Sequence, residues 1–481
     1  MHIGMVIWGL CTTRGGLQRV GALIANAMQK RGHKVTVFCN SNKSNNYITC
    51  YDLNEGIGIE IFDSNFSVDF LTKKKELLLG LDLDVLCALF SWDALLLFPK
   101  LMHRTGIPFI ISEHNNPRII NTERWNHYER LACLASADLI HLLTNDYREQ
   151  LPNFLKKKAI VIPNPAPSRF ATTNLAKRTQ KRIFAMGRFI DSHKNFSTLI
   201  SSFGTLSNSF PDWELVIAGE GKDLHLYENL IAKLRVGSRI HLIGQIDNVD
   251  DYYTTCDIFC IPSKYEGFPM VGLEALSHGL PIVGFASCSG LSEVVQHGHN
   301  GFLAEFPTQE SLSKWLSLLM QDNDLRSKMS HHSLMKRDAF DSEIIFNNWE
   351  NLFFRAAKSK NKTTIDELIS EDQERQFCQL ALSEILLRDD PFSKFFSTEL
   401  SEIRERVKKL ERTVNSFSHP KVNFSLIQRI ILAIYSPILF LGSKDKSYYY
   451  NFRHNPQGFF STTKHPVNKF VHKILTRFER T

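Results

Sequence analysis

The nine cysteines of this chain follow neither the spacing of a disulfide framework nor that of a metal site. They lie mostly inside apolar runs, and Cys256 and Cys260, which flank one such run, have no second pair of ligands nearby. We therefore expect buried free thiols in a reducing compartment, and no metal bound by cysteine.

Long hydrophobic runs are also missing, since no stretch reaches the roughly 18–20 apolar residues that a membrane-spanning helix requires. The apolar N-terminus carries no Lys or Arg before Arg14 and runs directly into a Gly15-Gly16 turn. These features favour a first β-strand over a signal peptide. The turn also lacks the G-x-G-x-x-G pattern of dinucleotide-binding proteins, and no fitting acidic residue follows it.

The chain is longer than one hydrophobic core usually supports, because it has 481 residues, 43% of them hydrophobic. Strand-like apolar runs alternate with helix-like segments twice, from Ile3 to Ile162 and from Arg182 to Ala304. This alternation predicts an α/β fold with two doubly wound, Rossmann-like domains that face a cleft. We expect domains at 1–165 and 166–357, a helical extension at 358–417 with a short heptad segment, and a basic, aromatic-rich tail at 418–481.

The most informative segment surrounds two glutamates, Glu266 and Glu274. An apolar strand-like run leads into it, and a helix is predicted over Met270–His278 with Pro269 at its first turn. Free backbone N–H groups and the helix dipole favour phosphate at such a helix start. Two carboxylates beside it suit a ligand with phosphates and hydroxyls, such as a sugar nucleotide. A capping acid and a solvated acid would give the same pattern.

Three further groups lie where ligands of doubly wound sheets bind, beyond the carboxyl ends of strands. Arg188 and Lys194 flank one loop and suit a departing pyrophosphate, although either alone would also suit a solvated surface. Gly15-Gly16 allows close approach of the backbone to a ligand, and a plain left-handed turn is the alternative. His114 ends another strand, and its position favours function over a structural hydrogen bond, as a proton carrier or as a positioning group.

Four segments in this order resemble the family-4 retaining glycosyltransferases with the GT-B fold. They are Gly15–Val20, Val161–Pro165, Met186–Asn195 and the E-G-F-P-M-V-G-L-E-A-L-S-H-G-L-P-I-V stretch that begins at Glu266. The resemblance covers roughly residues 1–357, about three-quarters of the chain. It implies an acceptor-side first domain and a second domain that binds the nucleotide-sugar.

The resemblance also implies a role for each candidate residue. Arg188, Lys194 and the Glu266 loop amides would stabilise the departing diphosphate, and Glu274 would bind the ribose. Phe268 and His114 would touch the sugar, and the Gly15-Gly16 turn would contact the diphosphate or the acceptor. The implied catalytic residues are His114, Glu266, Arg188 and Lys194, and the implied donor-binding residues are Gly15, Gly16, Arg188, Lys194, Gly267, Phe268, Met270, Val271 and Glu274.

A metal-dependent reaction is not expected. Asp82-Leu-Asp84 matches the D-x-D pattern of metal-dependent glycosyltransferases, but it immediately precedes the strand predicted at Val85–Phe90. This order places both carboxylates at the N-terminal edge of the sheet, away from the ligand-binding edge. We therefore expect that the hexosyltransferase implied by the resemblance uses no cofactor and no metal.

The resemblance implies a retaining enzyme, which we expect in the cytoplasm, peripheral on the inner face of the cytoplasmic membrane. It would transfer a hexose or N-acetylhexosamine from a UDP-sugar onto a lipid-linked or growing bacterial surface glycan, such as capsule, O-antigen or lipopolysaccharide. Two alternatives remain open: a catalytically silent GT-B scaffold that binds glycan or membrane, and a sugar-nucleotide 2-epimerase. The intact Glu266, Glu274, Arg188 and Lys194 argue against the scaffold.

The net positive charge of the chain lies entirely in its tail. Residues 418–481 contain ten Lys and Arg against two acidic residues, a net of +8, whereas the whole chain has +7. The apolar run Leu426–Leu441 is too short and Pro-broken to span a bilayer, and aromatic residues interleave with the basic ones. This pattern favours an anionic membrane surface over nucleic acid, with a packed helical subdomain as the alternative. The heptad-like repeat before it leaves the oligomeric state open.

Overall fold

The computed structural model describes residues 1–40, 49–62, 68–89, 97–102, 105–117, 127–167 and 181–358. The expected extension at 358–417, apart from Lys358, and the tail at 418–481 lie outside these residues. None of the helices in the described part of the chain combines the length and hydrophobicity needed to cross a bilayer.

The first domain contains a parallel sheet with the strand order β3-β2-β1-β4-β5-β6-β7. Its strands are β1 (His2–Ile7), β2 (Lys34–Cys39), β3 (Gly58–Ile61), β4 (Val85–Leu89), β5 (Phe109–Glu113), β6 (Leu139–Leu142) and β7 (Ala159–Val161). Its helices are α1 (Gly16–Lys30), α2 (Val68–Gly80), α3 (Leu97–Met102), α5 (His127–Ala135), α6 (Asn145–Glu149) and α7 (Asn153–Lys156). Central strands such as β1 and β4 are buried along their whole length, which explains their largely apolar sequences.

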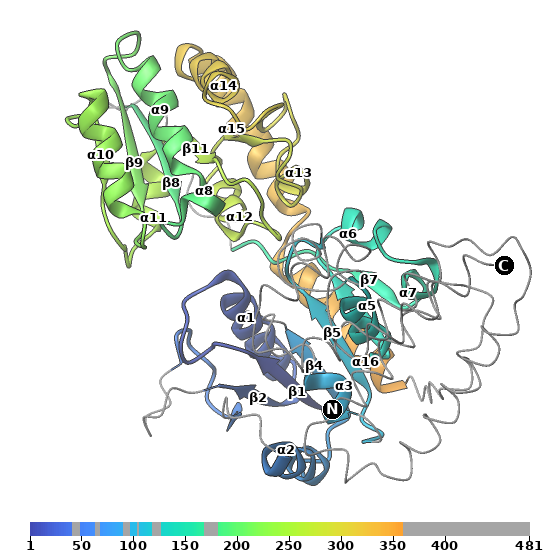
Figure 1. Ribbon diagram of the computed structural model, residues 1–481. Helices are drawn as coiled ribbons and strands as arrows, with labels where there is room; N and C mark the ends of the chain where they lie inside the picture. Colours follow the sequence, from blue (N-terminus) through green and yellow to red (C-terminus); the bar gives the residue numbers. More distant parts are fainter. Residues whose placement is uncertain are drawn as a thin grey trace, which may run out of the picture.

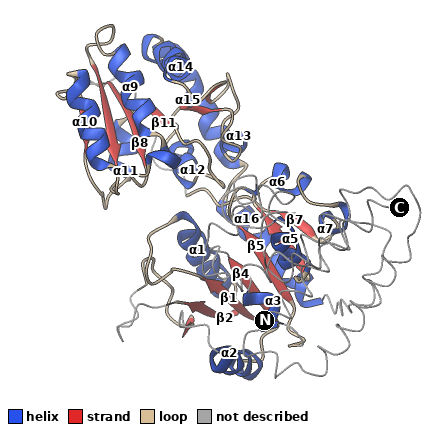
Figure 2. Ribbon diagram, in the orientation of Figure 1, coloured by secondary structure: helices blue, strands red, loops and turns tan. Residues whose placement is uncertain are grey.

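The second domain repeats this plan with the strand order β10-β9-β8-β11-β12-β13. Its strands are β8 (Lys181–Met186), β9 (Trp213–Ala218), β10 (Ile240–Leu242), β11 (Ile258–Ile261), β12 (Ile282–Phe285) and β13 (Gly301–Ala304). Its helices are α8 (Asp191–Lys194), α9 (Phe196–Leu206), α10 (Leu224–Leu234), α11 (Asp250–Thr255), α12 (Met270–Ser277), α13 (Leu291–Val294), α14 (Gln309–Gln321) and α15 (Asn323–Asp338). Helices flank the strands in both domains, which confirms the predicted pair of Rossmann-like folds (Figure 2).

The last described helix, α16 (Ser342–Lys358), returns to the first domain (Figure 1). Arg31, which directly follows α1, forms ion pairs with Glu343 and Glu350, at 2.6 and 3.3 Å. The ring of Trp349 lies 4.3 Å from that of His141 on β6, centroid to centroid. The boundaries expected from the sequence place residues 166–357 in one domain. In the structure, the part from 342 onward packs on the first sheet. An amphipathic helix packs where its apolar face is buried, and here that surface belongs to the first domain.

Candidate active site

Glu266 lies in the loop between β11 and α12, where its carboxylate has two close partners. Its Oε1 atom accepts hydrogen bonds from Lys194 Nζ and Ser263 Oγ, both at 2.6 Å. Burial acts to raise the pKa of Glu266, but the charges of Lys194 and His193 and the two hydrogen bonds outweigh it and hold the pKa below its ordinary value. Glu266 is therefore an ionised carboxylate whose charge is balanced by Lys194.

The segment that follows β8 is attached to the Glu266 loop by side-chain contacts of His193 and Asn195. Asn195 has a left-handed backbone (φ 55°) between α8 and α9, and its side-chain amide donates to the Pro262 carbonyl at 3.1 Å. The ring of His193 stacks on that of Tyr265, with centroids 4.4 Å apart, and its Nε2 lies 2.8 Å from the Tyr265 carbonyl oxygen. These contacts place Lys194 at the carboxyl ends of β8 and β11.

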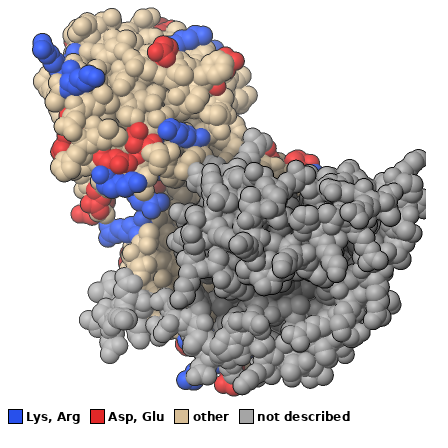
Figure 3. Space-filling view, viewed as in Figure 1, with Lys and Arg blue, Asp and Glu red and all other residues tan. Residues whose placement is uncertain are grey.

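Arg188, the other expected phosphate ligand, stands near the same edge and is exposed to solvent. Within the described residues the structure shows no ion pair to its guanidinium, whereas Lys194 is already engaged by Glu266. Charged side chains of both signs gather at the end of the second domain that faces the first (Figure 3). The structure thus brings Arg188, Lys194 and Glu266 to one sheet edge.

Glu274 lies one turn inside α12, as the sequence predicts. Its Oε2 accepts a hydrogen bond from the Tyr253 hydroxyl at 2.8 Å, and its Oε1 pairs with Arg19 of α1 in the first domain. Burial and the neighbouring Glu274 carboxylate raise the pKa of Tyr253, so the phenol stays protonated and donates. Glu274 is only 6% exposed, and its charge is balanced across the domain interface.

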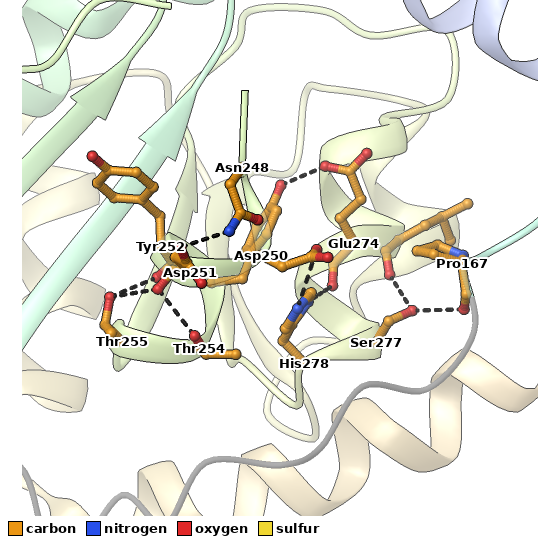
Figure 4. A network of polar contacts seen from close by, with 12 residues as sticks. Pro167, Asn248, Asp250, Asp251, Tyr252, Thr254, Thr255, Glu274, Ser277 and His278 are labelled. Carbon is orange, nitrogen blue, oxygen red and sulfur yellow. Dashed lines mark hydrogen bonds and ion pairs between the residues drawn. The ribbon is translucent and has the colours of Figure 1, made fainter. Parts of the chain in front are cut away.

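The other end of α12 is anchored within its own domain (Figure 4). Ser277 Oγ donates to the Pro167 carbonyl at 3.2 Å, and His278 Nε2 lies 3.5 Å from Asp250 Oδ1 on α11. Figure 4 shows Ser277 and His278 below Glu274, on the side away from the Glu274 carboxylate. These contacts attach the C-terminal end of α12 to Pro167 and to α11, at the end opposite the Glu266 loop.

His114 directly follows β5 and meets the Glu266 loop through its backbone. A Cβ atom added at Gly267 would collide with the His114 carbonyl oxygen, so glycine is required for this approach. The His114 side chain is 8% exposed, and its Nε2 lies 2.8 Å from Ser112 Oγ. Burial, and secondarily the nearby His141, lower the pKa of His114 to about 3, so the ring is neutral near pH 7.

The glycine turn before α1 also reaches the second domain. Gly15 has an extended backbone (φ −153°, ψ 165°) and not the left-handed one of the alternative interpretation. A Cβ added at Gly16 would lie 3.4 Å from Met270 Cγ, at the start of α12. The turn and the N-terminus of α12 therefore lie side by side.

Three expected donor-binding residues follow Gly267, and their side chains are differently placed. Phe268 is buried and packs edge-on against Phe340, with centroids 5.7 Å apart, and its expected contact with the sugar stays a prediction. Met270 is buried, and Val271 is half-buried with its carbonyl accepting from Tyr253 at 3.2 Å.

The sequence does not predict some of the residues that form contacts between the two domains. The Tyr147 hydroxyl of α6 donates to the Gly267 carbonyl at 2.7 Å, and Asn116 Nδ2 donates to Ser289 Oγ at 2.7 Å. Both contacts join the two domains beside the Glu266 loop. Arg19 belongs to the Gly15–Val20 motif, and no local pattern indicates that it pairs with Glu274.

The D-x-D segment lies where the sequence places it, at the N-terminal edge of β4. Asp84 Oδ2 accepts a hydrogen bond from the His2 backbone at 2.7 Å. No group of three or more His, Cys, Asp or Glu residues with metal-binding geometry occurs among the described residues.

Two family models match adjacent parts of the chain. The model described as Glycosyltransferase Family 4 covers residues 14–168, and the model described as Glycosyl transferases group 1 covers residues 169–333. These matches meet in the link between the two sheets. Together they include the glycine turn, His114, Arg188, Lys194, Glu266 and Glu274.

Known proteins agree with these models. An uncharacterized glycosyltransferase of Haemophilus influenzae is 30% identical over 346 residues, 70% of this chain and 96% of that one. The Campylobacter jejuni GalNAc-alpha-(1->4)-GalNAc-alpha-(1->3)-diNAcBac-PP-undecaprenol alpha-1,4-N-acetyl-D-galactosaminyltransferase is 23% identical over 51% of this chain and 67% of its own. Anabaena HepE, solved with UDP and glucose, shares the fold with a TM-score of 0.60 and 16% identity, covering 74% of this chain and 100% of that one. The chain belongs to the family-4 glycosyltransferases and has their GT-B fold.

Proposed function

We propose that this glycosyltransferase moves a hexose or N-acetylhexosamine from a UDP-sugar, with retention of configuration, onto a lipid-linked or growing bacterial surface glycan. The observation that carries the proposal is the half-buried Lys194–Glu266 pair at 2.6 Å, beside the exposed Arg188. The neighbouring Gly267 lies against the backbone of His114 in the other domain. A cation pair next to a carboxylate suits a ligand with a diphosphate at one end and hydroxyls at the other.

The donor would bind mainly to the second domain. Glu274 would accept hydrogen bonds from the ribose hydroxyls, while Arg188 and Lys194 contact the diphosphate. The α12 N-terminus presents backbone N–H groups after Pro269, and its dipole favours negative charge there. The UDP and glucose bound to HepE, which has the same fold, are consistent with such a donor.

Transfer with retention would proceed on one face of the sugar. The bond between the sugar C1 and the phosphate oxygen breaks, and the acceptor hydroxyl forms its bond to C1 on the face that the diphosphate vacates. The acceptor proton passes to the departing phosphate. Arg188 and Lys194 stabilise the negative charge that grows on this phosphate, so no metal ion is required.

The acceptor would approach from the first domain, beside the Gly15-Gly16 turn. The printed name of the Campylobacter relative describes a polyprenyl-diphosphate-linked glycan, which supports a lipid-linked acceptor here. We further propose that the protein works on the inner face of the cytoplasmic membrane, held peripherally by the basic tail at 418–481.

Donor hydrolysis and transfer assays across a panel of UDP- and GDP-sugars test this function. We expect slow hydrolysis of one or a few UDP-sugars by purified protein, with the anomeric configuration retained in the transfer product. Turnover restricted to GDP-sugars would refute the UDP donor, and absence of any turnover would favour a silent scaffold. Release of an epimerised sugar would indicate a 2-epimerase.

A further inference from the structure

His114 ends a chain of buried hydrogen bonds that runs back into the first domain. His114 Nε2 lies 2.8 Å from Ser112 Oγ, and Ser112 Oγ lies 2.7 Å from His141 Nδ1. His141 Nε2 in turn lies 2.8 Å from the Ile162 carbonyl oxygen. Ser112 and His141 are fully buried, so water does not compete for these contacts.

The Ile162 carbonyl, at the far end of this series of hydrogen bonds, determines which atoms carry the protons. A carbonyl oxygen only accepts, so His141 Nε2 must carry the hydrogen that it shares with Ile162. Burial lowers the pKa of His141 to about 4, so the ring is neutral near pH 7 and its Nδ1 is bare. The Ser112 hydroxyl must therefore donate to His141 Nδ1, which leaves its oxygen to accept from His114 Nε2–H.

The same argument fixes the remaining nitrogen. A neutral His114 with its hydrogen on Nε2 has a bare lone pair on Nδ1. Among the described residues, no group forms a hydrogen bond with His114 Nδ1. This atom is also not one of the fully buried polar atoms without a partner, so it is not completely enclosed by protein. We propose that Ser112 and His141 are positioning residues that hold His114 as its Nε2–H tautomer, so that Nδ1 is the acceptor in the contact with the donor sugar that the family resemblance implies. The identity of this partner rests on the proposed function.

An aromatic contact also holds His141 in this position. Its ring is held by Trp349 of α16, the helix that returns from the second domain, at a centroid distance of 4.3 Å. His114 is thereby a hydrogen-bond acceptor that orients the sugar, and its low proton affinity does not suit the role of proton carrier.

Nitrogen-15 NMR of histidine-labelled full-length protein tests the tautomer without any ligand. The His114 signals are assigned by their loss in His114→Gln. We expect a protonated Nε2 and a bare Nδ1 in the wild type. His141→Phe keeps an aromatic ring but removes both nitrogens, so Ser112 becomes free to donate to His114, and the hydrogen should move to Nδ1. His141→Gln retains an acceptor and a donor, and should retain the wild-type tautomer.

Turnover of the UDP-sugar found in the panel gives the second readout. We expect His141→Phe to lower kcat/KM roughly tenfold, His141→Gln to restore most of it, and inhibition by UDP alone to stay unchanged. A wild-type His114 protonated on Nδ1, or an unchanged tautomer in folded His141→Phe, would overturn the proposal. The expected tautomer without turnover of any UDP-sugar would confirm the hydrogen-bond chain but refute the proposed function, and with it the donor sugar as partner.

Discussion

Arg19 in α1 and Glu274 in α12 form an ion pair that joins the two domains across 255 positions of sequence. Glu274 is also the residue that we propose as the ribose ligand. The same carboxylate therefore serves the proposed nucleotide binding and the contact between the domains. Substituting Arg19 removes only the domain contact, whereas substituting Glu274 removes both, so the two effects can be separated.

Glu274→Gln and Arg19→Gln both remove this ion pair, but only the first removes a charged acceptor for the ribose. Because a hydrogen bond to a charged group contributes about 1.5–3 kcal/mol, we expect Glu274→Gln to raise the donor KM roughly tenfold or more. Arg19→Gln should raise it much less. Steady-state kinetics check this, and equal increases in KM would assign the effect to the domain contact instead.

Arg188→Ala and Lys194→Ala should each lower turnover roughly a hundredfold or more, because each removes a charge that stabilises the departing diphosphate. Lys194→Ala also leaves Glu266 without its cation, so thermal unfolding must be measured alongside. Arg188→Ala is the cleaner variant, since its side chain is exposed, and Lys233→Ala on α10 is a matched surface control. Full activity in both site variants would refute the diphosphate assignment.

Stability should fall as the pH is lowered, because the buried His141 and His114 both have lowered pKa values, and His141 is the one that can be replaced without touching the site. Its pKa is about 4 in the folded protein and 6.5 in the unfolded chain, so the unfolded state binds the proton first as the pH falls. This contribution is constant above about pH 6.5 and is lost between there and about pH 4, amounting to about 3 kcal/mol. Denaturation of the wild type and His141→Gln across this range should show a weaker pH dependence in the variant. Parallel curves would contradict the shift.

Treatment with EDTA should leave turnover largely intact, because we assign the stabilisation of the leaving group to Arg188 and Lys194. Asp82 and Asp84 lie at the opposite edge of the sheet and are not expected to bind a catalytic ion. Activity assays before and after chelation check this. Loss of activity that manganese or magnesium restores would refute metal independence.

Truncation after Phe417 should abolish sedimentation with anionic liposomes while leaving donor hydrolysis intact. Each Lys or Arg near anionic lipid contributes about 1 kcal/mol, weakened by salt. Binding of the full-length protein should therefore weaken at high salt without vanishing, since Leu426–Leu441 adds a salt-insensitive part. A truncated protein that still pellets with liposomes, or that unfolds, would indicate a packed subdomain.

The sequence alone determined the two sheets and the edge at which the candidate residues lie. Apolar periodicity reports local burial, and parallel strands necessarily bring their carboxyl ends to one edge. For this reason the positions of Glu266, Lys194, Arg188 and His114 after strands predicted that these residues lie at this edge.

Only the tertiary structure decided which of these residues meet and what covers them. The pairing of Arg19 with Glu274, the return of α16 to the first domain and the Ser112–His141 hydrogen bond join residues far apart in the chain. Phe268 shows the same limit, because no local pattern indicates that its ring packs against that of Phe340. Local patterns fix which face of an element is apolar, but the partner of a buried polar group depends on how distant elements pack.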